Sequence, residues 1–206
     1  MNPNPKIFKQ FNALVTLSVV AALLMLTSAQ PARAQALSVQ IDPAQSKVEY
    51  SLSSTVHTVH GTFAVKNGSV RYDPAGGQIS GTIVVDATSG QSGNDSRDGR
   101  MHREILESAK FPEIVFSPAT LTGAVAADGI SKVEVSGRFR LHGQEHEVTV
   151  PVEVKANGKN FDLTAHLEIP YVKWGLKNPS NFLLHVSETV TIEIQARGNV
   201  QSTGNP

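Results

Sequence analysis

The chain has 206 residues, with 18 Lys and Arg balanced by 18 Asp and Glu, and it contains no cysteine. Without cysteine it can form no disulfide and cannot be an acylated lipoprotein, so its stability must come from a packed core. The balanced charge lacks the basic excess that nucleic-acid binding leaves in a sequence, so no nucleic-acid partner is expected.

The first 34 residues follow the order of segments that is typical of a secretory signal peptide. Lys6 and Lys9 precede an almost wholly apolar run at residues 13–26, and Ala32-Arg33-Ala34 forms a small-x-small cleavage pattern. The apolar run is shorter than the roughly 20 residues that a membrane-spanning helix needs, which favours a cleaved signal peptide over the alternative, an uncleaved membrane anchor. We expect residues 1–34 to be removed and the mature chain, with 15 basic and 18 acidic residues and a net charge of −3, to be periplasmic or secreted.

Apolar and polar side chains alternate through most of the mature chain, which is the pattern of strands with one face in the core and one in water. Val148, Val150 and Val152, for example, alternate with Thr149 and Pro151. Similar segments occur around residues 48–52, 59–65, 79–85, 114–116, 133–141, 148–154, 161–169 and 186–196. The sequence therefore predicts about eight strands.

Short turns connect these strands. His142-Gly143-Gln144 and Asn157-Gly158-Lys159 are typical of hairpins, and Asn67-Gly68 and residues 73–77 predict further turns. Short turns force antiparallel neighbours, and eight such strands with one apolar face close most readily into a barrel. We predict an all-β fold, an antiparallel eight-stranded barrel at residues 35–198, with a two-sheet sandwich as the alternative and residues 199–206 as a flexible polar tail.

Two segments break the alternation. Residues 94–108 predict a short helix over one end of the barrel, because Asn94 or Asp95 can cap its first turn and its apolar side chains share one face. Those side chains are Met101, Ile105 and Leu106. Residues 170–179 contain the single tryptophan, Trp174, and predict a long loop before the last strand.

The dimensions of such a barrel suggest a ligand. Strands of about eleven residues with a tilt near 40° give a barrel on the order of 28 Å high, and eight strands enclose either packed side chains or one narrow ligand. Gly61, Gly81 and Gly137 on or near the apolar phase would leave room, so a long hydrocarbon chain fits, with a barrel filled by its own side chains as the alternative. The candidate lining residues are Phe63, Ile83, Val85, Phe116, Val135, Phe139, Val150, Leu163, Leu167, Trp174, Val190 and Ile192.

A polar headgroup cannot stay unpaired inside an apolar tube, so we expect it at the mouth. The candidate rim residues are Arg97, Asp98 and His102, beneath the loop that carries Trp174. We expect Arg97 and Asp98 to form an ion pair that holds the helix to the rim.

Histidines raise the alternative of a metal site. His57 and His60 are three residues apart, which puts them on opposite faces of a strand unless a bulge intervenes, and His142 and His146 flank a turn. No acid stands at a familiar ligand spacing near either pair, so we expect no metal ligand.

Motifs for catalysis are absent from the sequence. There is no Gly-x-Ser-x-Gly elbow, no cysteine nucleophile and no phosphate-binding glycine loop, so we expect no catalytic residue and no cofactor. Three classes remain, namely a lipid carrier, a structural or partner-binding barrel without ligand, and, with less support, a histidine-based metal protein or an enzyme.

Three stretches of sequence carry a family likeness: Ile41-Asp42-Pro43 with Ser46, the block at 94–102, and Phe-Pro-Glu-Ile-Val-Phe at 111–116. Together with residues 135–148 they resemble motifs of the YceI-like, polyisoprenoid-binding family over roughly residues 38–198. The resemblance implies an exported, elongated, lipocalin-like barrel with an isoprenoid or quinone-like lipid in its lumen. Gln40 departs from the family, which often has an aromatic residue there. Such a carrier could contact a membrane transiently, and the sequence leaves monomer and dimer open.

Overall fold

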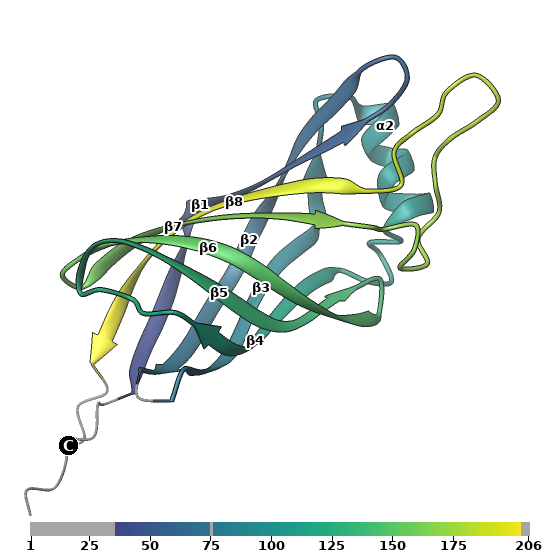
Figure 1. The fold of residues 1–206 in the computed structure, drawn as a ribbon. Helices are drawn as coiled ribbons and strands as arrows, with labels where there is room; N and C mark the ends of the chain where they lie inside the picture. The colour runs from purple at the N-terminus through teal and green to yellow at the C-terminus, as the bar shows by residue number, and fades with distance from the viewer. Residues whose placement is uncertain (1–35, 75, 203–206) are drawn as a thin grey trace, which may run out of the picture. The chain divides into compact units, whose positions relative to one another are not determined.

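The structure, a computed structural model, describes residues 36–74 and 76–202, so the signal peptide expected at residues 1–34 lies outside the described residues. Eight strands each pair antiparallel with the next, and the first pairs with the last to close a barrel (Figure 1). This meander confirms the predicted all-β barrel and excludes a sandwich. The strands are β1 (Leu37–Ser53), β2 (Thr58–Asp73), β3 (Gln78–Gln91), β4 (Glu113–Thr122), β5 (Asp128–Leu141), β6 (Gln144–Asn157), β7 (Asn160–Ile169) and β8 (Val190–Ser202).

The predicted hairpin between β5 and β6 is confirmed. His142 and Gly143 have φ of 51° and 77°, and positive φ at both central residues of a two-residue turn matches the right-handed twist of the strands. β6 and β7 are joined equally tightly around Gly158, whose φ is 59°. These tight turns keep neighbouring strands in sequence order around the barrel.

The turn predicted at Asn67-Gly68 is wrong, because both residues lie inside β2. The pairing of β2 with β3 slips between Val65 and Asn67, which marks a bulge rather than a chain reversal. Gly68 is buried where Ile41 of β1 packs over it, and a side chain at this position would overlap Ile41. Asparagine followed by glycine therefore serves close packing between two strands here.

The flexible tail predicted to begin at residue 199 is also wrong up to residue 202. β8 continues through Ser202, which pairs with Leu37 at the start of β1, and Asn199 pairs with Gln40. The alternating pattern does not predict this pairing, because β1 and β8 shift register between Asp42 and Lys47, around Pro43. The backbone of residues 199–202 thus gains hydrogen bonds that a free tail would lack, and residues 203–206 lie outside the described part.

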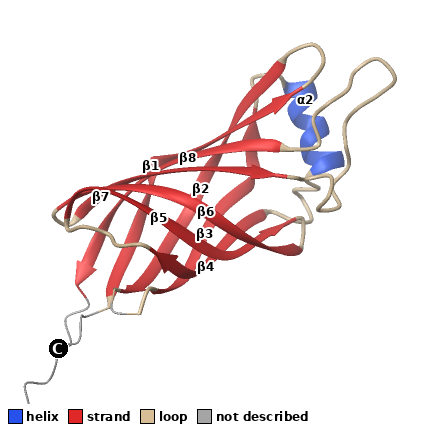
Figure 2. Ribbon diagram, in the orientation of Figure 1, coloured by secondary structure: helices blue, strands red, loops and turns tan. Residues whose placement is uncertain are grey.

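The predicted helix occupies one end of the barrel. It consists of α2 (Asp95–Arg100) followed by a π-helical turn, η1 (Met101–Ile105), and both lie beside the β1–β2 turn and the long β7–β8 loop (Figure 2). Asn94 caps α2 by accepting a hydrogen bond from the Arg97 amide at 3.0 Å. Among the described residues no helix is long and apolar enough to cross a membrane.

The barrel interior is packed differently in its two halves. In the half away from α2, buried side chains from β4, β5, β6 and β7 form one cluster, consisting of Leu121, Val133, Val135, Val150, Val152 and Ala165. We call this half the filled half. Near α2 a second buried cluster packs against η1, the β7–β8 loop and several strands, and it consists of Leu141, Ile169, Tyr171 and Leu176.

Candidate functional site: an apolar cavity at one end of the barrel

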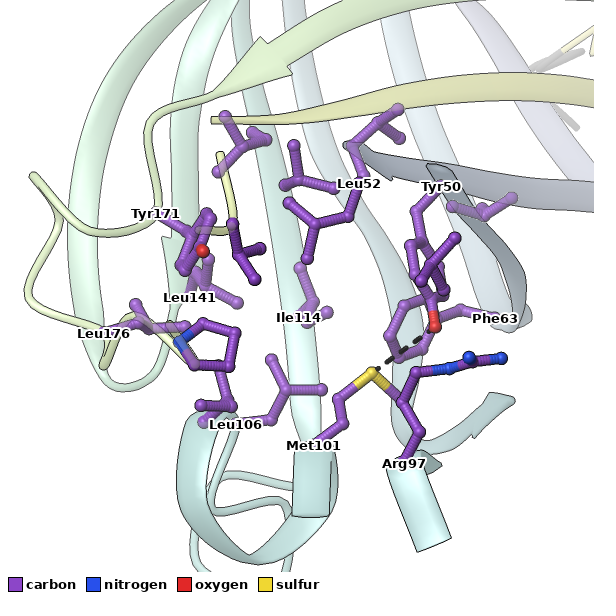
Figure 3. A pocket seen from close by; sticks show the side chains of 18 of the residues that line it. Tyr50, Leu52, Phe63, Arg97, Met101, Leu106, Ile114, Leu141, Tyr171 and Leu176 are labelled. Carbon is purple, nitrogen blue, oxygen red and sulfur yellow. Dashed lines mark hydrogen bonds between the residues drawn. The ribbon is translucent and has the colours of Figure 1, made fainter. Parts of the chain in front are cut away.

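An apolar cavity of about 550 Å³ occupies the end of the barrel that α2 covers (Figure 3). Side chains from every strand except β6 contribute to its wall, together with α2, η1 and the β7–β8 loop. Apart from the hydroxyls of Tyr50 and Tyr171, the polar residues on the wall all lie at its outer edge, in α2 or at the turn between β1 and β2. They are Ser54, His57, Asn94, Ser96, Arg97 and Arg100.

The filled half closes the inner end of the cavity. Leu167 of β7 and Ile194 of β8 both line the cavity and pack against the buried cluster of the filled half. These two side chains therefore form a floor. The alternative expected from sequence, a barrel filled by its own side chains, describes the half below this floor, and the half above it is hollow.

The helix covers the cavity with apolar side chains. Met101, Ile105 and Leu106 line the cavity as their shared helical face predicts, and Figure 3 shows Met101 and Leu106 pointing toward the strands. The Tyr50 hydroxyl donates to the Met101 sulfur at 3.6 Å, and the Tyr50 ring lies 5.5 Å from that of Phe63. Burial raises the pKa of Tyr50, so its hydroxyl stays protonated and neutral beside the apolar space.

A polar cluster fixes the start of the helix at the mouth. Both oxygens of Asp98 accept hydrogen bonds from the Ser92 amide at 3.0 Å, and the Ser92 hydroxyl also donates to Asp98. Arg97 donates from Nε to the Ser92 hydroxyl at 2.7 Å and from Nη2 to the Ser92 carbonyl at 3.0 Å. Arg97 and Asp98 thus meet on Ser92 instead of pairing directly as the sequence suggested, and of the two only Arg97 lines the cavity.

The environment of the Asp98 carboxylate predicts that the stability of the fold depends on pH. Burial alone would favour the neutral acid, but the Ser92 hydroxyl and amide and the Arg97 charge outweigh it and hold the pKa of Asp98 below its ordinary value of 3.8. Asp98 therefore binds a proton more readily in the unfolded chain than in the folded one. Its contribution to the free energy of unfolding is complete above pH 3.8 and is lost as the pH falls through the lower pKa of the folded state.

Asp98→Asn is expected to lower the free energy of unfolding at neutral pH by about 1–2 kcal/mol, because a charged acceptor is replaced by a neutral one. It should also flatten the loss of stability in acid. Urea unfolding of both proteins across the acid range checks this, and parallel curves for the two would contradict it.

The loop from residue 170 to 189 forms another side of the cavity. Tyr171 and Leu176 line it, and the Tyr171 hydroxyl donates to the Ser187 carbonyl at 2.7 Å, which ties the two ends of the loop together. Burial, with a smaller contribution from the Glu188 charge, raises the pKa of Tyr171 to about 12. The loop is therefore held by a neutral hydroxyl over the whole physiological range.

Trp174 lies outside the cavity wall. Its ring stacks on His146 at 4.0 Å between centroids with an interplanar angle of 3°, and it lies 5.8 Å from the ring of Phe139. Because Phe139 does line the cavity, Trp174 is one side chain away from any occupant. The single tryptophan is thus a spectroscopic reporter of the site.

The structure separates the predicted lining residues into groups. On the cavity wall lie Phe63, Val85, Phe139, Leu167, Val190 and Ile192. In or against the buried cluster of the filled half lie Phe116, Val135, Val150 and Leu163, and Leu167 belongs to both groups. Ile83 in β3 is half-buried, does not line the cavity and pairs with Phe116.

Sequence reasoning missed several wall residues. Tyr50, Leu52 and Leu141 continue the apolar phase of β1 and β5, so alternation could have included them, whereas Tyr171 and Leu176 lie in an irregular loop that carries no periodic signal. The remaining missed apolar residues of the strands and the β7–β8 loop are Val48, Val59, Ile114, Ile169, Pro179, Leu184, Val186 and Ile194.

The glycines expected to leave room in the lumen do not do so. A Cβ at Gly61 would overlap the Tyr50 ring, and one at Gly137 or Gly81 would overlap a backbone carbonyl of the neighbouring strand. Their missing side chains allow close approach between neighbouring strands.

Three histidines have ordinary hydrogen-bond partners, whereas the buried Nε2 of His146 has none among the described residues. His60 bonds the Ser51 hydroxyl at 2.8 Å, and His142 pairs with Glu107 at 2.9 Å. His102 bonds the Ser108 hydroxyl at 2.9 Å and the Gly90 carbonyl at 2.8 Å, so it braces the helix from below the rim. Across residues 36–74 and 76–202, no group of three or more His, Cys, Asp or Glu residues could hold a metal ion.

Comparison with known proteins gives a consistent result. Residues 39–197 match the family model of the YceI-like domain. A curated relative, a UPF0312 protein of Pseudomonas putida strain W619, is 25% identical over 195 residues, which cover 89% of this chain and 96% of that protein.

Solved structures share the fold. BcnA of Burkholderia cenocepacia matches with a TM-score of 0.64 and 21% identity, over 76% of this chain and 98% of that one. A polyisoprenoid binding domain from Saccharophagus degradans, described as implicated in plant cell wall breakdown, matches with a TM-score of 0.61 and 18% identity, over 79% and 98%. The YCEI protein of Campylobacter jejuni matches with a TM-score of 0.56 and 15% identity, over 68% and 84%.

Proposed function

Since the chain belongs to the YceI-like family, we propose that its barrel binds one long apolar lipid of the polyisoprenoid or quinone type and carries or sequesters it without catalysing a reaction. The observation that carries this proposal is the cavity, whose polar wall residues are confined to the mouth apart from two tyrosine hydroxyls. The description of the Saccharophagus degradans domain as polyisoprenoid-binding supports the same ligand class.

The chemistry of the cavity favours a ligand with two unlike ends. A volume of about 550 Å³ lies within the range of small-molecule sites, roughly 300–1,000 Å³. Each buried CH₂ contributes about 0.8 kcal/mol to binding, so a hydrocarbon chain in contact with the inner wall binds more tightly as more of it is buried. A carbonyl or hydroxyl group at the other end would find the Arg97 guanidinium and the Ser96 and Asn94 side chains at the mouth.

Lipid content of the folded protein tests this proposal. Protein purified after export by a bacterial host is extracted into organic solvent, and the extract and the intact complex are measured by mass spectrometry. We expect one long-chain apolar molecule per folded chain, and addition of an isoprenoid quinone to emptied protein should quench Trp174 fluorescence through the Phe139 contact. A protein that contains no lipid after purification and takes up no added quinone from detergent would refute the carrier function.

We also propose export, on the basis of the basic, apolar and small-residue order of residues 1–34. N-terminal sequencing of the exported protein should begin at Gln35 or Leu37, directly after the small residues of the cleavage pattern. A membrane-bound form that retains Met1 would show instead that the apolar run is an anchor.

A further inference from the structure

Large apolar side chains are exposed beside the mouth of the cavity. Phe182 is 95% exposed and Leu183 is 83% exposed in the β7–β8 loop, and Val56 is 72% exposed in the β1–β2 turn. Ile130, 63% exposed at the start of β5, is the other large apolar residue of this kind among the described residues. We call residues 54–57 and 178–187 the mouth loops.

The mouth loops are held in place, so this exposure is a feature of the fold. The Thr55 amide donates to the His185 carbonyl at 2.9 Å, which joins one loop to the other. The Asn181 side chain accepts hydrogen bonds from the Leu183 and Leu184 amides, each at 2.9 Å, and the Asn181 amide donates to the Leu184 carbonyl at 2.9 Å. Phe182 and Leu183 are therefore the central residues of a fixed turn that presents them to the outside.

The exposed residues continue the surface of the cavity. Leu184 and His57 line the cavity and directly follow the exposed Leu183 and Val56 in the sequence, and Val186 also lines the cavity. Residues 51–59 and 178–187 include no Asp, Glu, Lys or Arg. A surface without Asp, Glu, Lys or Arg thus extends from the cavity to the tips of both loops, where Phe182, Leu183 and Val56 are exposed.

We propose that the mouth loops dock on a lipid bilayer and insert Phe182, Leu183 and Val56 into its interfacial region, so that the cavity opens toward the acyl chains. Aromatic and aliphatic side chains without neighbouring charges favour this region, and no ionised side chain of the loops would lose its hydration there. The reason for docking rests on the proposed function, since a ligand with a long apolar chain resides in a bilayer before transfer. Docking itself is independent of the ligand and is measured without it.

Flotation with phosphatidylcholine vesicles free of isoprenoid tests the proposal on the full mature chain. The double variant Phe182→Ser, Leu183→Ser should bind these vesicles at least about tenfold more weakly than the wild type, because the apolar side chains that insert are removed. Ile130→Ser removes an exposed apolar side chain in the β5 strand away from the mouth loops and should bind as the wild type does. Binding should persist at high salt, since the mouth loops carry no ionised group that salt would screen.

A second measurement guards against a folding defect in the double variant. Phe182→Trp combined with Trp174→Phe leaves one tryptophan at the tip, and its emission should shift to shorter wavelength with vesicles. Failure of the wild type to bind vesicles, equal binding by the double variant, or an unshifted tip tryptophan would overturn the proposal. Tip-dependent self-association without vesicle binding would overturn it too and would identify a second copy of the chain as the occupant.

Loading from detergent separates this proposal from the carrier function. The double variant keeps every cavity residue, so it should take up an isoprenoid quinone from detergent micelles as the wild type does. A wild type that binds vesicles and takes up no quinone would refute the carrier function and leave docking intact.

Discussion

Replacing Val150 with aspartate is expected to lower the free energy of unfolding by about 4 kcal/mol. Val150 is 6% exposed and belongs to the buried cluster of the filled half, where it packs with Val135 and Val152. A carboxyl group there would lose its hydration and gain no hydrogen-bond partner, and it would have to remain neutral at a large cost. The urea midpoint measured by circular dichroism gives the change.

Thr149→Asp is the matched control, one residue away on the outer face of β6. The Thr149 side chain is exposed and shares a hydrogen bond of 2.9 Å with the Ser136 hydroxyl. An exposed carboxylate keeps its hydration, so the cost should stay at or below about 1 kcal/mol. Equal destabilisation by the two variants would show that the inward and outward faces of β6 are wrongly assigned.

Replacing Ile192 with tryptophan is expected to weaken binding of an isoprenoid quinone at least about tenfold while the barrel stays folded. Ile192 lines the cavity on β8 between Val190 and the floor residue Ile194, so a larger ring there takes space that the ligand chain needs. A tenfold loss equals about 1.4 kcal/mol, less than the burial of two CH₂ groups. Quinone loaded per folded chain, measured after extraction, gives the result.

Glu193→Trp places the same side chain on the neighbouring outward-facing position of β8. Glu193 is exposed and its carboxylate lies 3.9 Å from His166, a surface contact of little energetic weight. This variant should load as the wild type does. If Ile192→Trp also loads normally, the cavity is not where the chain binds.

The sequence predicts the barrel well because alternation is a local signal. Val148, Val150 and Val152 reveal which face of β6 is inward, and the glycine turns after Leu141 and Asn157 reveal the order of the strands. Register shifts carry no such signal, which is why Asn67-Gly68 predicts a turn although β2 passes through it as a bulge.

The sequence predicts the site less completely than it predicts the barrel, for a physical reason. Alternation tells which side chains point inward, but it gives no height along the barrel axis. Val135 and Phe139 share one face of β5, yet Val135 belongs to the filled half and Phe139 to the hollow one. Residues of the β7–β8 loop, such as Leu176, enter the cavity through tertiary contacts that periodicity cannot reveal.

The floor made by Leu167 and Ile194 limits the length of ligand chain that the cavity can hold. A chain that enters tail first gains contacts until its end meets these two side chains, and any further isoprene unit stays outside. Affinity should then rise with the number of units and reach a plateau, so homologues beyond that size would compete as equals. The longest homologues would be bound at one end while the other end stays outside the barrel.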